Sequence, residues 1–491
     1  MRENPGRRWL QAVSAAVLLM GSGGLVPLAA NAQDGYPDPT FSGDGYVGLG
    51  FPNPPTDDDW LDAITAQPDG KILIAGRTCA GSVGGECTMM VVRLLPGGNL
   101  DPRFSGDGMI PLSFGFFPNA DDQRPARILH LTPSGKTLVV GLVTDTHGRD
   151  RVGLLRLNVN GSLDSTFGGN GTGAVVHFIP GGGGVLKVMA AVAAQGYIYV
   201  GGYGTLTGYL DQDYFIARFT ADGLLDSTYA GGVGVRWIVF DQGQENDDKL
   251  ADLAVQSDGK VVAVGQISDS TAGDHDTGFV RLTQTGFLDG SFNGGAAVGN
   301  GKVIWQRNDF LLTESDIPVS VAIQPDGRIL FSGSDSVVGQ VSDSVWYFGR
   351  LLKNGASDPQ LSYRAVDFGP GSDFGAQLLM QSDGKIVLSG ESGATINGGA
   401  PWCSAARFVD DGASVTLDPT FGAGGLQGIA PPLWTFFCKQ AVVSGGRLII
   451  GGYGALGGGD RDLFVMRWTG ALVFNDGLAS GSTGAWSAAS P

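Results

Sequence analysis

The sequence has few of the residues on which many catalytic and metal sites depend. It contains only four histidines, His130, His147, His177 and His275. They do not recur in register and form no HExxH spacing, so the sequence gives little support for a histidine-ligated zinc site or a Ser-His-Asp triad. Charged residues are also scarce at 16%, with a net charge of -17. A negative field of this size repels polyanions and argues against nucleic acid as a partner.

Long apolar runs are confined to the N-terminus. A basic segment with Arg7 and Arg8 precedes an apolar stretch, residues 9–28, and the small-residue triplet Ala30-Asn31-Ala32 follows. This layout is typical of a secretory signal peptide over residues 1–32, and the paired arginines also allow twin-arginine export. No later stretch reaches the roughly 20 apolar residues that a spanning helix requires. We therefore expect an exported protein, secreted, periplasmic or at the cell surface, with no transmembrane segment in the mature chain.

Cysteine is rare, with four residues in the chain. In an exported protein, four cysteines suggest two disulfides. Cys79 and Cys87 lie eight residues apart in a glycine-rich stretch, and they would close a local ring worth about 2–3 kcal/mol by loop entropy. Cys403 and Cys438 form the remaining pair. The alternative is four free, buried thiols.

Glycine, by contrast, is abundant, with 82 residues. Glycine adopts positive φ angles in tight turns at little steric cost. An excess of glycine without collagen periodicity therefore predicts a turn-rich, all-β protein. Apolar residues make up 42% of the chain, which is enough for large cores and argues against disorder.

One ten-residue stretch returns along the chain. QPDGKILIAG begins at Gln67, and close copies begin at Gln256, Gln324 and Gln381. An Asp-Gly turn between apolar segments predicts a β-hairpin. Alignment on this turn places a glycine at seven positions roughly 60 residues apart, which indicates a repeat architecture. The seven positions are Gly70, Gly135, Gly196, Gly259, Gly327, Gly384 and Gly446.

Two charged landmarks recur with the turn, and each also occurs seven times. An arginine ends an apolar strand, and an aspartate follows in an approximate L-D-x-x-F sequence. Because an arginine in an apolar strand needs a partner to offset its desolvation, we predict one structural ion pair per repeat. The alternative is a set of seven equivalent arginines that grip anions. The predicted pairs are Arg93–Asp101, Arg156–Asp164, Arg218–Asp226, Arg281–Asp289, Arg350–Asp358, Arg407–Asp418 and Arg467–Asp38.

Each repeat is consistent with four short antiparallel strands, as in the blade of a β-propeller. The chain after the leader opens with YPDPTFSGDGYVGLGF, the last part of a repeat, and the final repeat stops after VMRW, just before that part. Joining the two ends completes a seventh blade and hides two sheet edges. We therefore predict an all-β fold, a seven-bladed β-propeller of four-stranded antiparallel blades over residues 33–470, with the ring closed by the N-terminal strand. Residues 471–491 are predicted to be a poorly ordered tail.

The wording and spacing of QPDGKILIAG, MMVVRL and LDPRFSGDG resemble the delta-60 repeat family of exported bacterial proteins. The resemblance covers residues 34–468. It implies a propeller-like fold and a surface or extracellular setting, and it brings no established activity. The third, fifth and seventh repeats depart from the pattern with AAQGYIYVGG, DPQL and VSGGRLIIGG, which leaves their local turn geometry open.

Aspartates gather before the first strand of several repeats, and four of them are candidate calcium ligands: Asp59, Asp248, Asp316 and Asp373. Carboxylates clustered at one rim suit a cation that takes about six to eight oxygen ligands. The alternative is that these aspartates accept hydrogen bonds from nearby backbone amides. Because no stretch matches the twelve-residue calcium loop, no cofactor is predicted and calcium is a secondary hypothesis.

The recurring landmarks leave ligand recognition to the loops that vary between repeats. The longest variable stretches, residues 77–88, 203–212, 334–345 and 391–402, all lie between the second and third strands and should share one face. We predict a binding or scaffold protein that takes an unidentified protein or glycan through these loops.

Two other functions stay open, and no catalytic residue is assigned. One is a hydrolase or lyase that acts on extracellular polysaccharide with carboxylates at the mouth of the central channel. The other is a purely structural role in the cell envelope. Tryptophans such as Trp60 occupy different positions in different repeats, so we interpret most of them as packing residues.

Overall fold

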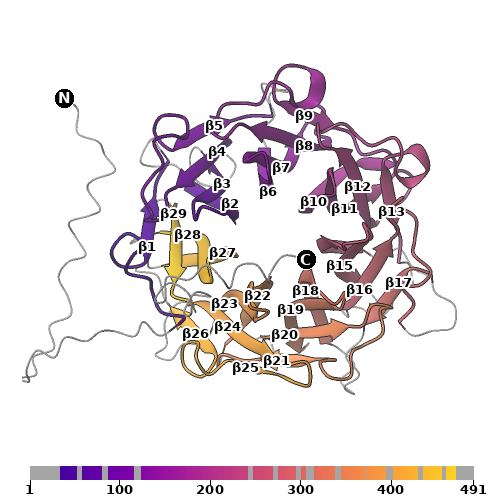
Figure 1. Ribbon diagram of the computed structural model, residues 1–491. Helices are drawn as coiled ribbons and strands as arrows, with labels where there is room; N and C mark the ends of the chain where they lie inside the picture. The colour runs from indigo at the N-terminus through magenta and orange to yellow at the C-terminus, as the bar shows by residue number, and fades with distance from the viewer. Residues whose placement is uncertain are drawn as a thin grey trace, which may run out of the picture.

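The chain forms a closed ring of β-sheets around a central axis (Figure 1). The predicted leader and the predicted tail lie outside the described residues. Within the described residues, the helices are two single 3-10 turns, η2 (Phe167–Gly169) and η3 (Ala230–Gly232), and none is long and apolar enough to cross a membrane. The computed structural model describes residues 34–51, 58–79, 87–114, 123–240, 247–268, 275–294, 300–305, 314–337, 344–369, 371–393, 402–429, 435–455 and 461–470.

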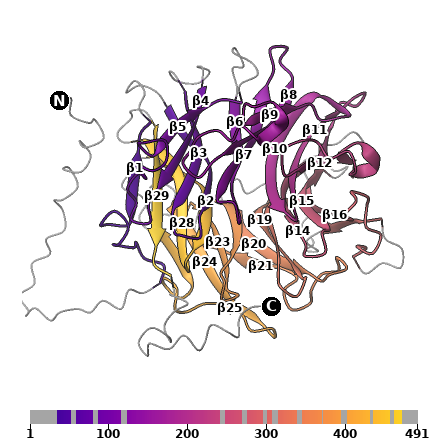
Figure 2. The same cartoon turned by 45° about the horizontal axis from the view of Figure 1, so that its top comes forward.

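Four-stranded antiparallel blades follow one another around the ring (Figures 1 and 2). Blade 1 contains β2 (Asp58–Ala66), β3 (Ile72–Cys79), β4 (Cys87–Leu94) and β5 (Met109–Leu112). Blade 2 contains β6 (Gln123–Leu131), β7 (Lys136–Thr144), β8 (Asp150–Leu157) and β9 (Ala174–His177). Blade 3 contains β10 (Gly182–Ala194), β11 (Tyr197–Leu206), β12 (Gln212–Thr220) and β13 (Val235–Ile238).

The second half of the ring repeats this order. Blade 4 contains β14 (Lys249–Val255), β15 (Val261–Ser268), β16 (His275–Leu282) and β17 (Lys302–Trp305). Blade 5 contains β18 (Glu314–Ile323), β19 (Ile329–Val337), β20 (Ser344–Leu351) and β21 (Arg364–Val366). Blade 6 contains β22 (Asp373–Met380), β23 (Ile386–Ser392), β24 (Trp402–Asp410) and β26 (Leu426–Ile429), with the short β25 (Val415–Leu417) also paired to β24.

Blade 7 is built from both ends of the described chain. It contains β27 (Thr435–Ser444), β28 (Arg447–Ala455) and β29 (Arg461–Trp468), and its outer strand is β1 (Tyr46–Leu49). β1 pairs antiparallel with β29, in a register that runs from Tyr46 opposite Met466 to Leu49 opposite Leu463. The predicted seven-bladed propeller and its closure by the N-terminal strand are therefore confirmed.

The core is divided into seven apolar clusters, and each cluster lies between two neighbouring blades. In β3, Ile72 and Ile74 pack against blade 7, whereas Leu73 and Ala75 pack against blade 2. Both faces of this strand are therefore buried, which explains why the second strand of each repeat is a continuous apolar run.

The seven predicted arginine–aspartate pairs are all in contact. In each pair, the arginine Nε donates to the aspartate Oδ2. The distances are 2.9 Å for Arg93–Asp101, 2.5 Å for Arg156–Asp164, 2.7 Å for Arg218–Asp226, 2.8 Å for Arg281–Asp289, 2.7 Å for Arg350–Asp358, 2.8 Å for Arg407–Asp418 and 2.9 Å for Arg467–Asp38.

Each arginine also reaches beyond its own repeat, as Arg281 illustrates. Its Nη1 donates to the carbonyl oxygen of Lys353 in blade 5, and its Nη2 donates to Ser291 Oγ at 2.9 Å. The ring of Phe292, the last residue of the local L-D-x-x-F sequence, lies 4.8 Å from the guanidinium. The arginine and Asp289 side chains are only 5% and 10% exposed. A buried cation thus connects the third strand of one blade, the turn that follows this strand and a turn of the next blade.

The junction between the chain ends completes this ring of contacts. Arg407 is in blade 6, and blade 7 is the next blade of the ring. The third and fourth strands of blade 7, β29 and β1, come from opposite ends of the described chain, so no turn joins them. Arg407 Nη2 donates instead to Asp34 Oδ2 at 2.7 Å, and the amide of Gly422 donates to the carbonyl oxygen of Asp34 at 2.8 Å. The first described residue therefore takes the place of the missing turn.

The departures in the third and seventh repeats change the hairpin turn and leave the blade intact. In the regular repeat, Gln67 N donates to Lys71 O at 2.8 Å and Gly70 has a φ of 81°. In the third repeat the turn shortens to two residues, Gln195 and Gly196, with φ angles of 53° and 81°. The seventh repeat uses a two-residue turn of two glycines in the same way. Two-residue turns of this kind match the twist of a hairpin.

We expect Arg281→Ala to lower the free energy of unfolding by about 3–5 kcal/mol, because it leaves Asp289 buried without its cation. Arg103→Ala, which removes an exposed arginine from the turn of blade 1, should change it by less than about 0.5 kcal/mol. Denaturant unfolding of the two variants beside the parent protein measures both effects. Equal losses in the two variants would contradict a structural role for the buried pair.

Candidate functional site

A β-bulge lies near the start of the innermost strand in every blade. In blade 1 the pairing of β2 with β3 shifts between Leu61 and Ala63. Gly76 lies beneath this bulge, and a Cβ at that position would overlap the carbonyl oxygen of Trp60. Gly76 is the last residue of the repeated QPDGKILIAG stretch, and a glycine meets the same carbonyl in each of the other blades. These glycines are Gly141, Gly202, Gly265, Gly333, Gly390 and Gly452.

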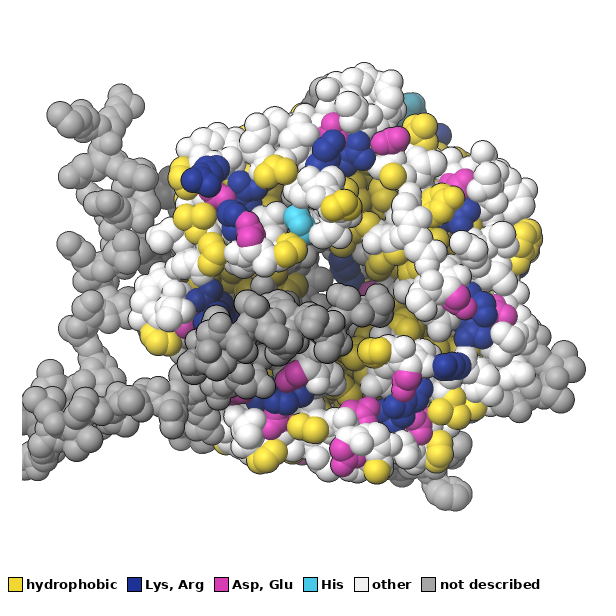
Figure 3. Space-filling model, in the orientation of Figure 1, with side chains coloured by type: hydrophobic (Ala, Val, Ile, Leu, Met, Phe, Trp, Pro, Cys, Tyr) yellow, Lys and Arg dark blue, Asp and Glu magenta, His cyan; other side chains and the backbone are white. Residues whose placement is uncertain are grey.

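The residues whose carbonyls face these glycines form one row around the axis, which we call the axial row. Their side chains are exposed or half-buried on the innermost strands. The opposite end of the ring, with the hairpin turns, is the face in Figure 3, and it is hollowed near the axis. The axial row consists of Trp60 in blade 1, Arg124 in blade 2, Lys187 in blade 3, Lys249 in blade 4, Ile317 in blade 5, Phe374 in blade 6 and Phe437 in blade 7.

The axial row lies at the end of the ring that carries the variable loops. Strands alternate in direction within a blade, so the start of the first strand and the connection between the second and third strands share one end. The described parts of the four variable stretches, residues 77–79, 87–88, 203–212, 334–337, 344–345, 391–393 and 402, therefore lie at that end. Residues 80–86, 338–343 and 394–401 are outside the described ranges. The seven arginine–aspartate pairs lie at the opposite end, beside the turns between the third and fourth strands.

Aromatic rings gather on the axial row where blade 7 meets blade 1. The ring centroids of Trp60 and Tyr453 are 4.6 Å apart, and those of Phe437 and Tyr453 are 5.3 Å apart. Tyr453 is opposite Phe437 in the β27–β28 register, so both face the same side of blade 7. We call these three residues the aromatic cluster.

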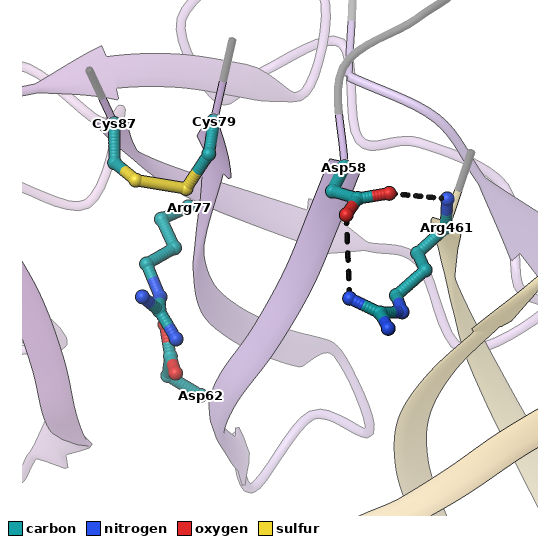
Figure 4. Close-up of a disulfide and its surroundings, with 6 residues drawn as sticks. All are labelled: Asp58, Asp62, Arg77, Cys79, Cys87 and Arg461. Atoms are coloured by element: carbon teal, nitrogen blue, oxygen red, sulfur yellow. Dashed lines mark hydrogen bonds and ion pairs between the residues drawn. A yellow bond between two sulfur atoms is a disulfide. The ribbon is translucent and has the colours of Figure 1, made fainter. Parts of the chain in front are cut away.

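Two ion pairs flank Trp60 of the aromatic cluster. Figure 4 shows the four residues of these pairs. Arg77 Nε lies 3.1 Å from Asp62 Oδ2, and the bulge of β2 brings Asp62 to this side. Arg461 donates to both carboxylate oxygens of Asp58, from its backbone amide at 3.1 Å and from Nη1 at 3.2 Å. The guanidinium carbons of Arg77 and Arg461 lie 5.3 Å and 4.5 Å from the centroid of the Trp60 ring. Both arginines are therefore within the range of a cation–π interaction with the indole.

The carboxyls and the phenol of this site have shifted pKa values. Burial raises the pKa of Asp62 to about 6, although Arg77 beside it favours the charged form. Burial, with the negative charge of Glu391, raises the pKa of Tyr453. Burial also raises the pKa of Glu391, whose Oε1 accepts the amide of Cys438 at 2.7 Å. A carboxyl that titrates near neutral pH is suited to proton transfer as well as to hydrogen bonding.

Both predicted disulfides are confirmed, and both brace strands that carry the site. Cys79 and Cys87 lie opposite each other in the β3–β4 register, with Cα atoms 4.0 Å apart, and they close this hairpin just beyond Arg77 (Figure 4). Cys403 in β24 is bonded to Cys438 in β27, with Cα atoms 5.6 Å apart. This second bond joins blade 6 to blade 7 beside Phe437.

A further ion pair joins two blades that are not neighbours in the ring. Arg127 in blade 2 and Asp252 in blade 4 lie 3.9 Å apart, Nη2 to Oδ1, although blade 3 separates their blades. The equivalent residue of blade 3 is Ala190. Asp252 Oδ2 also accepts the amide of Val321 in blade 5 at 3.0 Å. Polar contacts near the axis thus connect blades that are not neighbours in the ring.

The candidate calcium ligands do not come together. Asp59, Asp248, Asp316 and Asp373 are all buried, and they belong to blades 1, 4, 5 and 6. Three of them accept amides from the preceding connection: Phe51 N at 2.7 Å for Asp59, Phe240 N at 2.9 Å for Asp248 and Phe368 N at 3.1 Å for Asp373. Among the residues described, no group of three or more His, Cys, Asp or Glu side chains is placed to hold a metal ion.

Sequence reasoning did not find most of the residues at this site. It assigned Trp60 to packing, and it assigned no role to Arg77, Tyr453 or Phe437. The signal was nevertheless present, because the glycine that ends each repeated hairpin marks the bulge. The axial-row residue, whose carbonyl faces that glycine, could have been aligned in all seven repeats.

Comparisons with known proteins agree with the fold. Three segments, residues 67–104, 132–167 and 256–292, match a family described as "Domain of unknown function (DUF5122) beta-propeller". Each matched segment contains three features of one blade: the hairpin turn, the third strand with its buried arginine, and the turn with the aspartate partner of that arginine. No curated protein matches the sequence.

Solved structures of the same fold are distant in sequence. The polysaccharide lyase PL25-Ulvanlyase bound to -[GlcA(1-4)Rha3S]- is 9% identical, covers 85% of this chain and 95% of its own, and has a TM-score of 0.51. A protein of unknown function from Dyadobacter fermentans is 12% identical, with 87% and 99% coverage and a TM-score of 0.44. Drosophila Plexin A in complex with Semaphorin 1b is 9% identical, with 89% and 87% coverage and a TM-score of 0.41.

The raised pKa of Asp62 predicts a pH-dependent stability. Unfolded aspartate titrates near 4, so the folded protein retains a proton on Asp62 between about pH 4 and pH 6, and the stability from the protonated carboxyl is lost as the pH rises through this range. Asp62→Asn should abolish this loss, so that its melting temperature rises relative to the parent between pH 4 and 6. Calorimetry from pH 4 to 8, with the exposed Asp107→Asn as control, measures the difference. Parallel curves for Asp62→Asn and the parent would contradict the shift.

Proposed function

We propose that this protein is an exported carbohydrate-binding propeller whose axial row binds a glycan. The observation that carries the proposal is the aromatic cluster at the junction of blades 7 and 1, flanked by the Arg77–Asp62 and Arg461–Asp58 pairs. The two disulfides support an exported location, because such bonds persist in oxidising compartments.

The chemistry of the aromatic cluster suits a sugar ring. Aromatic faces pack against the apolar C–H face of a pyranose, while guanidinium donors and carboxylate acceptors pair with its hydroxyls. Ligand sites of this kind combine apolar surface with a few placed polar groups. A site with only aromatic residues, or with only ion pairs, would lack one half of this recognition.

The scaffold around the aromatic cluster is rigid, which favours binding. The disulfides hold β3 to β4 and blade 6 to blade 7, and Tyr453 is almost fully buried in the core between blades 7 and 1. A site that is ordered before the ligand arrives loses less conformational entropy on binding.

Trp60→Ala should reduce glycan affinity by about tenfold or more, since it removes the central ring of the cluster. The measurement is a glycan array followed by calorimetry on the strongest ligand. Phe437→Ala tests the same cluster through a ring that is 44% exposed, and it remains informative if Trp60→Ala unfolds. Phe287→Ala, an exposed ring at the opposite end, is the matched control. Unchanged affinity in both cluster variants would contradict the proposal.

A second candidate function is cleavage of the bound polysaccharide. The pKa of about 6 at Asp62, close to Tyr453, is the specific observation that favours it, because both groups can transfer protons. The fold is compatible with either role, since the ulvan lyase with which this chain shares its fold is a polysaccharide lyase. A product assay on the ligand found by the array separates the candidates: binding without product supports the first, and product release that Asp62→Asn abolishes supports the second.

A further inference from the structure

We infer that the ligand of the proposed site is an acidic polysaccharide, a chain of sugars that carry carboxylate or sulfate groups. The inference rests on the proposed function and names the ligand class of the same site. Its starting point is the order of residues in the axial row. Three consecutive blades carry a base in this row, and the other four consecutive blades carry an apolar or aromatic residue.

The basic arc consists of Arg124, Lys187 and Lys249 in blades 2, 3 and 4. Arg124 and Lys187 are exposed, and Lys249 is half-buried with its ammonium group 3.3 Å from Asp247. Long basic side chains on an inner strand keep their charged ends in water and can turn toward a ligand on the axis. The chain as a whole has more acidic than basic residues, so three bases at one structural position run against its overall balance.

The apolar arc consists of Ile317, Phe374, Phe437 and Trp60 in blades 5, 6, 7 and 1. Ile317, Phe374 and Phe437 are 40%, 52% and 44% exposed, so burial in the core does not account for them. Single exposed apolar residues are common on protein surfaces. Large exposed apolar residues at the same position in consecutive blades are not scattered singly, however, and such a grouping is typical of a binding site.

Several carboxylates near the axial row lie against cations. Asp247 lies against Lys249 of the basic arc, Asp62 against Arg77, Asp58 against Arg461 and Asp252 against Arg127. Burial raises the pKa of Glu391. None of the seven axial-row residues is acidic. The axial-row residues themselves are therefore basic on one arc and apolar on the other.

The two arcs face each other across the axis because their blades occupy opposite parts of the ring (Figure 1). An acidic sugar matches this arrangement: its C–H face packs on the apolar arc, and its carboxylate or sulfate pairs with the basic arc. A neutral sugar would have no anionic group to pair with the basic arc. A single-stranded nucleic acid also combines rings with anions, but its dense charge is opposed by the net charge of -17.

The test compares charged and neutral probes on the mature protein. Oligogalacturonate supplies carboxylates, a sulfated galactan oligosaccharide supplies sulfates, cello-oligosaccharide is neutral, and oligothymidylate represents nucleic acid. Lys187→Ala should weaken binding of the preferred acidic sugar by about tenfold to a hundredfold, the loss expected from one charge-assisted hydrogen bond, and binding should also weaken with added salt. Lys71→Ala, which removes the same charge from a turn at the opposite end, should leave the affinity unchanged.

The outcomes separate this inference from the proposed function. Binding of an acidic sugar that Lys187→Ala and Trp60→Ala both weaken supports both conclusions, and the preferred probe distinguishes carboxylate from sulfate. Equal binding of neutral sugar, sensitive to Trp60→Ala and insensitive to Lys187→Ala, overturns the acidic ligand and leaves the proposed function standing. Preferential binding of oligothymidylate overturns the acidic ligand in favour of nucleic acid. No sugar binding on the array overturns both.

Discussion

Every blade of this propeller buries both faces of its sheet, and the rest of the structure depends on that constraint. A residue such as Ile72 packs against the preceding blade and its neighbour Leu73 against the following one. A blade at an open end of the array would leave one such face in water, at a cost of about 25 cal/mol for each Å² of apolar surface. The array avoids this cost by closing into a ring, and in this chain both ends contribute to the blade that closes it.

The two ends of the ring differ in which contacts recur in every blade. At the end with the hairpin turns, each buried arginine connects its own aspartate with a turn of the next blade, so the repeat retains the same charged residues seven times. At the other end, the contact that recurs in every blade is between a glycine and the backbone carbonyl of an axial-row residue. The side chain at that position is exposed or half-buried in every blade. The axial row can therefore hold a tryptophan in one blade and a lysine in another without disturbing the fold.

The same division explains which features could be predicted from the sequence. The blade count, the closing strand and the arginine–aspartate partners follow from motifs that recur in register, because a structural contact repeated seven times leaves seven copies of its residues. Asp59 and Asp248 were ambiguous, since an aspartate that accepts a backbone amide and one that binds calcium look alike in sequence. The aromatic cluster could not be predicted as a unit: Trp60 and Tyr453 are nearly 400 residues apart and meet only because the ring closes.

The sequence by itself determined the period, the hairpins, the ion pairs and the need for closure, because these rest on local propensity and on contacts repeated between neighbouring blades. The tertiary structure alone decided where the non-repeating residues meet. Closure brings Arg461 and Tyr453 from one end of the chain to Asp58 and Trp60 near the other, and the bulge turns Asp62 toward them. A site built from residues that differ between repeats has no repeated signal, so its composition becomes visible only when the blades are arranged around a common axis.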